Sequence, residues 1–159
     1  MIVSLKKFLS IRDECRDCGE KVVFTNGCFD ILHYGHLDYL IKAKKMGDIL
    51  VVAVNTDSSV KKFKAEGRPI ISEKYRAKLV DGLNPVDYVI LFGEETPQKL
   101  IERIRPDVLV KGADYKLSEI VGADIVRSYE GKVRRIKLVP GLSTTRILLK
   151  IKESNNLGI

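Results

Sequence analysis

The chain has 159 residues, of which 45% are hydrophobic and 31% are charged, and its formal net charge is +7. This balance excludes an intrinsically disordered chain and predicts one domain, residues 1–159, with a core that needs no disulfide or metal. The longest apolar runs, such as residues 49–54, are far shorter than the roughly 20 residues of a membrane-spanning helix. We also identify no signal peptide, so we expect a cytoplasmic protein without membrane contact.

The first feature along the chain is a CxxC pair formed by Cys15 and Cys18. No second CxxC or spaced histidine pair completes a zinc site, and the third cysteine, Cys28, leaves an odd number for pairing. We therefore expect free thiols in a reducing compartment and no metal site. The positive charge predicts anionic partners. Nucleic acid is one candidate, but the basic residues are scattered with few aromatic residues among them, and nucleotide phosphates and a phosphorylated substrate explain the charge equally well. We expect no nucleic-acid partner.

Strands and helices are predicted to alternate along the rest of the chain. The expected strands are residues 21–25, 48–55, 87–91, 107–111 and 132–139, and the expected helices are residues 34–46, 72–84, 97–104, 118–129 and 143–152. Ser72, Thr96 and Ser143 are the expected N-caps. This alternation predicts an α/β, Rossmann-like, doubly wound parallel five-stranded sheet with helices on both faces. Ligands bind such sheets beyond the carboxyl ends of the strands.

The segment that follows the first strand contains the only two histidines of the chain. His33 and His36 are three residues apart at the start of a helix, so their imidazoles are expected on one face. Gly27 allows the backbone to approach a ligand, and Gly35 leaves room for a phosphoryl group. The helix N-terminus adds free N–H groups and a partial positive charge. Together these features predict a clamp for a phosphate that gains negative charge in a transition state.

The two ends of the chain resemble motifs of one superfamily. His33-x-Gly35-His36, preceded by Gly-x-Phe-Asp at residues 27–30, resembles the HxGH signature of nucleotidylyltransferases. Residues 141–145, Gly-Leu-Ser-Thr-Thr, resemble the ISTT motif of the cytidylyltransferase-like branch. Residues 51–57, 59–64, 67–70, 94–98 and 110–115 are similar to D-glycero-β-D-manno-heptose 1-phosphate adenylyltransferases, which occur alone or as the C-terminal half of a bifunctional kinase–adenylyltransferase.

This resemblance extends from about residue 20 to residue 151 and implies the stand-alone form. The implied reaction joins ATP and a sugar 1-phosphate, D-glycero-β-D-manno-heptose 1-phosphate, to give ADP-heptose and pyrophosphate for lipopolysaccharide or another surface glycan. Mg²⁺ is expected on the phosphates of ATP, since no carboxylate cluster is present to hold it. Relatives suggest a homodimer.

The resemblance also implies a set of site residues. The implied catalytic residues are His33, His36 and Lys64. The implied nucleotide-binding residues are Asn26, Gly27, Cys28, Phe29, His33, Gly35, His36, Lys111, Gly112, Asp114, Ser143, Thr144 and Thr145. The implied substrate-binding residues are Asp30, Asp57, Lys61, Lys64 and Arg76. Lys61 and Lys64 are expected on a mobile loop after Asp57. Arg76 is expected to face the active site or a dimer contact, although a plain surface arginine fits its position equally well.

Several alternatives remain open from the sequence. Leu138-Val139-Pro140 stands where glycerol-3-phosphate cytidylyltransferases carry Arg-Thr-Glu, and the loss of that arginine argues modestly for ATP over CTP. A cytidylyltransferase for a polyol phosphate or an FAD synthetase-like adenylyltransferase would use the same motifs. From another class, a basic RNA-binding module accounts for the charge but leaves the histidine pair unexplained.

Overall fold

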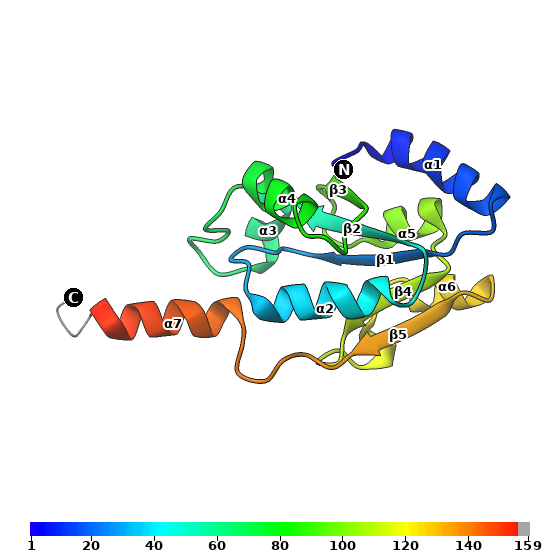
Figure 1. The fold of residues 1–159 in the computed structure, drawn as a ribbon. Coiled ribbons are helices and arrows are strands. Elements are labelled where there is room, and N and C mark those ends of the chain that lie inside the picture. The colour runs from blue at the N-terminus through cyan, green and yellow to red at the C-terminus, as the bar shows by residue number, and fades with distance from the viewer. Residues whose placement is uncertain (156–159) are drawn as a thin grey trace.

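A five-stranded sheet forms the centre of the computed structural model, which describes residues 1–155 (Figure 1). The strands are β1 (Val22–Gly27), β2 (Ile49–Asn55), β3 (Tyr88–Phe92), β4 (Val108–Gly112) and β5 (Lys132–Ile136). All pairs are parallel, and the spatial order is β3-β2-β1-β4-β5. The predicted doubly wound parallel sheet is confirmed. Because the strand order reverses its direction between β1 and β4, the switch point of the sheet lies between these two strands.

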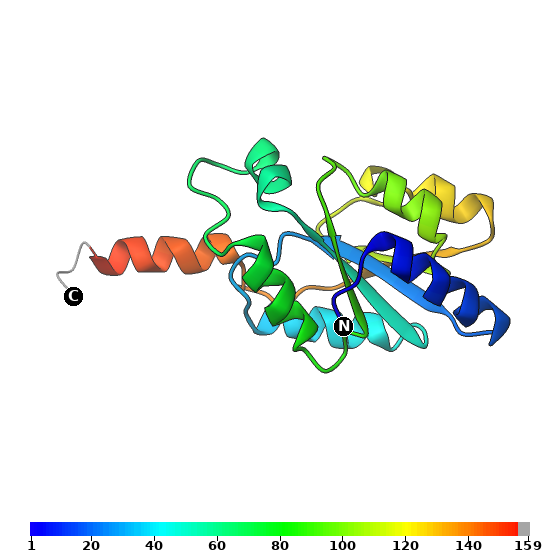
Figure 2. The same cartoon turned by 90° about the horizontal axis from the view of Figure 1, so that it is seen from above.

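Helices cover both faces of this sheet (Figure 2). On one face α1 (Leu5–Asp17), α5 (Gln98–Ile104) and α6 (Ala123–Ser128) pack in one apolar cluster with alternate strand residues such as Phe24. On the other face α2 (Tyr34–Lys44) and α4 (Glu73–Asp81) pack in a second cluster with the neighbouring strand residues, such as Val23. Successive side chains of a strand point to opposite faces of the sheet, so Phe24 packs in one cluster and its neighbour Val23 in the other.

Two further helices lie at the carboxyl-end edge of the sheet. The short helix α3 (Asp57–Phe63) directly follows β2, and α7 (Thr144–Asn155) projects away from the body of the molecule in both views (Figures 1 and 2). Arg146 N donates to the Ser143 side chain at 3.2 Å, so the expected cap of this last helix is confirmed. Within residues 1–155, no helix has both the length and the hydropathy of a membrane span.

The strand expected over residues 132–139 ends at Ile136, and Pro97 rather than the expected Thr96 is the N-cap of α5. The structure differs from the sequence prediction more strongly in three other elements. Helix α1 was not predicted, although Ser4 caps it and Phe8 and Cys15 are buried on its inner side. Helix α3 replaces the first half of the expected mobile loop. The single helix expected over residues 118–129 is wrong, because the chain forms a 3₁₀ turn, η1 (Leu117–Glu119), and then α6. Gly122 separates the two with φ +82°, a left-handed conformation that ordinary side chains rarely adopt.

Candidate active site

A cavity of about 670 Å³ opens at the carboxyl ends of the strands, beside the switch point. Its wall combines the segments that follow β1, β4 and β5 with the loop that follows α3. It brings together most of the site residues predicted from the sequence: Asn26, Gly27, Cys28, Phe29, Asp30, His33, Gly35, His36, Lys64, Lys111, Gly112, Asp114, Ser143, Thr144 and Thr145. Residues more than 110 positions apart in the chain therefore share one site, as the two sequence motifs predicted.

The two histidine rings stack against each other at the start of α2. The ring centroids of His33 and His36 are 3.9 Å apart with an interplanar angle of 19°, and the Phe29 ring lies 5.3 Å from that of His36. Both Nδ1 atoms are buried and accept or donate no hydrogen bond within the described part of the chain. The rings of both histidines line the cavity, and neither Nδ1 is engaged by another group of the protein.

The histidines are held in their neutral form at physiological pH. Burial lowers the pKa of His36 to about 4, and the charge of a protonated His33 acts in the same direction. Burial also lowers the pKa of His33 below its ordinary value. Neutral imidazoles can donate one N–H to a phosphoryl oxygen without carrying a charge of their own. The pair is thus suited to hydrogen bonding rather than to acting as a fixed cationic clamp.

Glycine is required beside the histidine pair because the backbone passes close to the rings. A Cβ on Gly35 would lie 3.0 Å from Nδ1 and 3.1 Å from Cε1 of His33, and a Cβ on Gly27 would lie 3.1 Å from the Phe29 ring. A larger residue at either position would require the neighbouring ring to shift by a few tenths of an ångström. Gly35 therefore allows the backbone to pass close to the His33 ring.

Lys111 extends from the end of β4 to the end of β1 across the switch point. Its ammonium donates to the side-chain oxygen of Asn26 and, at 3.3 Å, to the Asn26 carbonyl, and it lies 5.6 Å from the centroid of the Tyr115 ring. Burial lowers its pKa to about 8, even though the charges of Cys28 and Asp114 act in the opposite direction. No carboxylate among the described residues forms an ion pair with this ammonium, so an anionic ligand would stabilise its charged form.

The start of α7 closes another side of the cavity. Ser143 caps the helix through its hydroxyl group, and the Thr144 hydroxyl donates to the Ile31 carbonyl at 3.4 Å. The Thr144 contact joins the second motif to the loop that carries the histidines. With α2, the site therefore has the N-termini of two helices at its wall, an arrangement that favours negatively charged groups.

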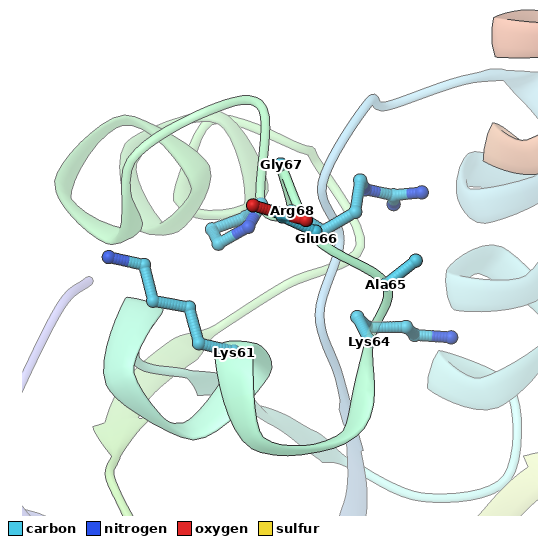
Figure 3. A pocket seen from close by; sticks show the side chains of 7 residues that line it. Lys61, Lys64, Ala65, Glu66, Gly67 and Arg68 are labelled. Carbon is cyan, nitrogen blue, oxygen red and sulfur yellow. The ribbon is translucent and has the colours of Figure 1, made fainter.

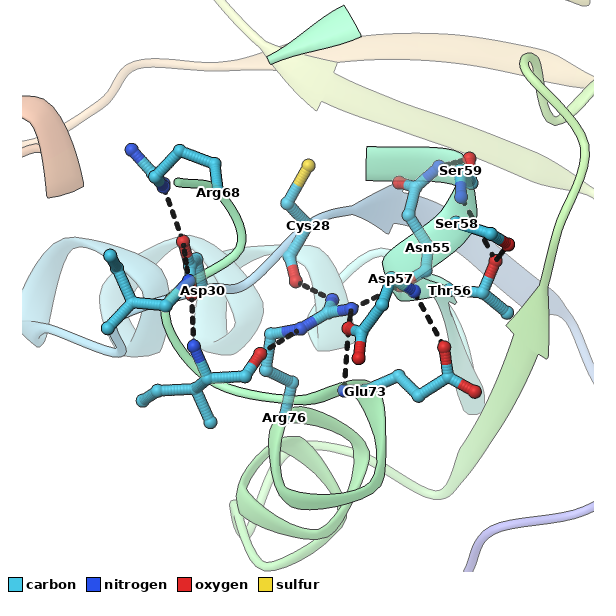
Figure 4. A network of polar contacts seen from close by, with 12 residues as sticks. Cys28, Asp30, Asn55, Thr56, Asp57, Ser58, Ser59, Arg68, Glu73 and Arg76 are labelled. Carbon is cyan, nitrogen blue, oxygen red and sulfur yellow. Dashed lines mark hydrogen bonds and ion pairs between the residues drawn. The ribbon is translucent and has the colours of Figure 1, made fainter. Parts of the chain in front are cut away.

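Arg76 occupies an interior position that the sequence did not indicate. It is fully buried, and its three nitrogens donate to Ile71 O at 2.8 Å, to Cys28 O, and to both Asn55 O at 2.7 Å and Asp57 Oδ1 at 2.8 Å (Figure 4). The surface-arginine interpretation is wrong, because the guanidinium is buried and enclosed by protein oxygens. Arg76 instead ties the ends of β1 and β2 to α4.

Asp57 and Lys61 also lie outside the cavity wall. Asp57 is engaged with the start of α4: its Oδ1 accepts from Glu73 N at 2.8 Å, and its own N–H donates to the Glu73 carboxylate at 2.6 Å. Lys61 lines a neighbouring hollow, where it extends to the opposite side of the loop from Lys64 and Arg68 (Figure 3). Of the two lysines predicted on this segment, only Lys64 lines the main cavity.

Some cavity residues were not predicted from the sequence. Arg68 and Tyr39 are the main polar examples, and Thr96, Pro97 and Leu142 contribute further surface. Tyr39 lies on the buried side of α2, and its hydroxyl shares a 2.7 Å hydrogen bond with Thr25. Helical spacing from His36 places Tyr39 on the same face, which is a signal that could have identified it.

Comparison with known proteins places this geometry in a family. The sequence model of the cytidylyltransferase-like family matches residues 24–153, which include both motifs and the cavity. The chain belongs to the cytidylyltransferase-like family. This membership confirms the predicted nucleotidyltransferase class.

Similar proteins cover nearly the whole chain. It is 50% identical over 152 residues to the bifunctional protein HldE of Pseudomonas paraeruginosa, which covers 96% of this chain and 32% of that protein. It is 57% identical over 137 residues to the protein of the same name in Campylobacter concisus, with 86% of this chain and 28% of that protein covered. The chain thus spans about a third of the length of these curated relatives.

A solved structure is similar as well. The crystal structure of the lipopolysaccharide core biosynthesis protein from Thermoplasma volcanium is matched with a TM-score of 0.61 and 34% identity, over 76% of this chain and 98% of that one. The similarity to known proteins therefore extends from the sequence to the fold.

Proposed function

We propose that this protein transfers the adenylyl group of ATP to a sugar 1-phosphate, D-glycero-β-D-manno-heptose 1-phosphate, releasing pyrophosphate and forming ADP-heptose. The observation that carries the proposal is the stacked pair His33 and His36, whose side chains line a cavity with two helix N-termini at its wall. The heptose as acceptor is supported by the 50–57% identity to the bifunctional HldE proteins. It is also consistent with the lipopolysaccharide-related structural neighbour.

In this reaction an oxygen of the sugar phosphate attacks the α-phosphorus of ATP. A new P–O bond forms as the bond between the α-phosphorus and the oxygen that bridges to the β-phosphorus breaks, and that oxygen leaves with pyrophosphate. Both reactants are anions, so the protein contributes chiefly positioning and charge stabilisation. His33 and His36 would donate hydrogen bonds to phosphoryl oxygens, while Lys64 and Lys111 would supply positive charge.

The preference for ATP rests on the chain segment after β5. Leu138 and Val139 line the cavity where the polyol-phosphate cytidylyltransferases carry an arginine linked to CTP. The side chains of Leu138 and Val139 offer no donor to the oxygen of a cytosine ring, whereas an arginine would. Cytidylyl transfer to a polyol phosphate is the second candidate, favoured by the family description alone.

The proposed reaction requires Mg²⁺ as part of the nucleotide substrate. Among residues 1–155 no group of three or more histidine, cysteine or carboxylate side chains is arranged to hold a metal ion. Asp30, an acidic residue of the cavity wall, already accepts hydrogen bonds from Arg68 and two backbone N–H groups. The ion would therefore enter as the MgATP complex, with the phosphates as its main ligands.

The proposal is tested by a product assay with purified protein. ATP, CTP and GTP are each offered with both anomers of the heptose 1-phosphate, with hexose 1-phosphates and with glycerol 3-phosphate. The nucleotide-linked product and the pyrophosphate are quantified. We expect ADP-heptose from one anomer and no product with His36→Ala beyond a trace. Preferential formation of CDP-glycerol would assign the protein to the second candidate function.

A further inference from the structure

Two arginines lie near one another in the polar network beside the cavity, and they are bound in different ways (Figure 4). Each nitrogen of Arg76 donates to a protein oxygen, and the residue is fully buried. Arg68 uses only Nε, which donates to Asp30 Oδ2 at 2.6 Å. Its two terminal amino groups have no hydrogen-bond acceptor among the residues that the structure describes. Every guanidinium nitrogen of Arg76 is therefore engaged within the protein, whereas the two terminal amino groups of Arg68 remain available to a ligand.

Asp30 is a rigid support for the Arg68 guanidinium. Its side chain is 1% exposed, and its carboxylate accepts hydrogen bonds from Ile70 N and Ile71 N, both at 2.9 Å. Burial acts to raise the pKa of Asp30, but these backbone donors and Arg68 outweigh it, so the pKa lies below its ordinary value. The carboxylate therefore remains charged and fixed in place. A guanidinium bound through Nε to a fixed acceptor presents its remaining donors in one defined direction.

Arg68 lies between the substrate cavity and the neighbouring hollow, and it lines both. Arg68 lines the cavity together with Lys64, and the two side chains extend to the same side of the loop, whereas Lys61 extends to the other side (Figure 3). Burial raises the pKa of the Cys28 thiol, which lies in the segment after β1, and the positive charges of Lys64, Arg76 and Arg68 act in the opposite direction. The Arg68 side chain is only 14% exposed, so water can reach its free amino groups only in part.

We infer that Arg68 is a phosphate-binding residue of this site, whose two terminal amino groups bind phosphate oxygens while Asp30 holds the guanidinium in position. This role deepens the proposed adenylyl transfer and rests on it. A planar guanidinium with two parallel donors matches two oxygens of one phosphate, a geometry that lysine cannot provide. Sugar 1-phosphate and ATP both carry this chemistry, and separate kinetic constants for the two substrates distinguish them.

The kinetic test compares Arg68→Gln and Arg68→Lys with the matched control Lys62→Gln, an exposed lysine of α3 outside the cavity wall. We expect both Arg68 variants to raise one KM, for either the sugar 1-phosphate or ATP, by at least tenfold, with a smaller change in the other. Arg68→Lys retains the charge beside Asp30 and is the informative variant if Arg68→Gln does not fold. The control should match the wild type. Equal KM values in wild type and a folded Arg68→Lys variant would overturn the inference.

A binding measurement separates this inference from the identity of the sugar. Isothermal titration with ATP, with pyrophosphate and with inorganic phosphate needs no turnover. If the wild type makes no ADP-sugar, yet its affinity for one of these probes falls at least tenfold in Arg68→Lys, the proposed reaction is wrong and the phosphate site stands. If ADP-heptose forms normally and Arg68→Lys changes neither a KM nor the binding of any probe, the phosphate site is wrong and the reaction stands.

Discussion

The buried His36 makes a quantitative prediction about the stability of the protein in acid. Its pKa falls from 6.5 to about 4 on folding, chiefly because of burial. Between these two values the unfolded chain binds a proton on this ring and the folded protein does not, so protonation stabilises the unfolded state. The contribution of the neutral ring is therefore fully present above pH 6.5 and is lost as the pH falls toward 4.

The size of the effect follows from the separation of the two pKa values. One pKa unit corresponds to about 1.4 kcal/mol, so the limiting loss is about 3 kcal/mol, and about 2 kcal/mol of it should be lost between pH 7 and pH 5. The His36→Asn variant lacks this titration. Its free energy of unfolding should fall less steeply over the same range, although His33 shifts in the same direction in both proteins.

The measurement is urea-induced unfolding of wild type and His36→Asn at pH 7, 6 and 5 in one buffer of constant ionic strength. We expect the difference between the two free energies of unfolding to change by about 2 kcal/mol from pH 7 to pH 5 in the direction that penalises the wild type. If the free energies of unfolding of the two proteins changed with pH in parallel, His36 would have the same pKa in the folded and the unfolded state. The reasoning from its burial would then be refuted.

Three further predictions concern catalysis and specificity. His36→Ala should lower turnover by roughly 10²–10³-fold with a much smaller change in nucleotide affinity, because one transition-state donor is lost. A normal chemical step in pre-steady-state kinetics would contradict this. Lys64→Ala should cost about 2–4 kcal/mol in kcat/KM and Lys62→Ala almost nothing, since only Lys64 lines the cavity. Similar small losses of kcat/KM in the two variants would indicate that Lys64 is a solvated surface residue without a role in the reaction. ATP should exceed CTP in kcat/KM because Leu138 and Val139 line the cavity, and equal use of CTP would refute this.

The fold was predictable because its signals are local. Strands β1 to β4 are short, mostly apolar runs, and the alternation of strand and helix patterns leaves few arrangements other than a parallel sheet. The histidine motif was equally accessible, since His33, Gly35 and His36 lie within four residues. The sheet topology then brings Ser143 and Thr144 to the same edge. Two sequence motifs predict a site well when the fold alone determines that they meet in space.

The pairing of buried charges was not predictable by the same reasoning. Asp30 and Arg68 are 38 residues apart, and nothing in either local sequence distinguishes this ion pair from contacts with solvent. For Arg76 the sequence left open the active site, a dimer contact and a plain surface position, and full burial was not expected because a charged residue is seldom fully buried. Its burial depends on carbonyl groups at the ends of two strands, which become neighbours only in the folded sheet. Such contacts depend on three-dimensional packing.

The cavity and the two apolar clusters of the sheet have few residues in common. Phe29, Tyr39 and Ile120 belong to both, and the rest of the cavity wall lies mostly on segments outside the packed strands. Substitutions on these segments can alter which acceptor is bound with little loss of folding free energy. Evolution, or selection in the laboratory, can therefore explore new acceptors on this scaffold largely free of the destabilisation that core substitutions carry.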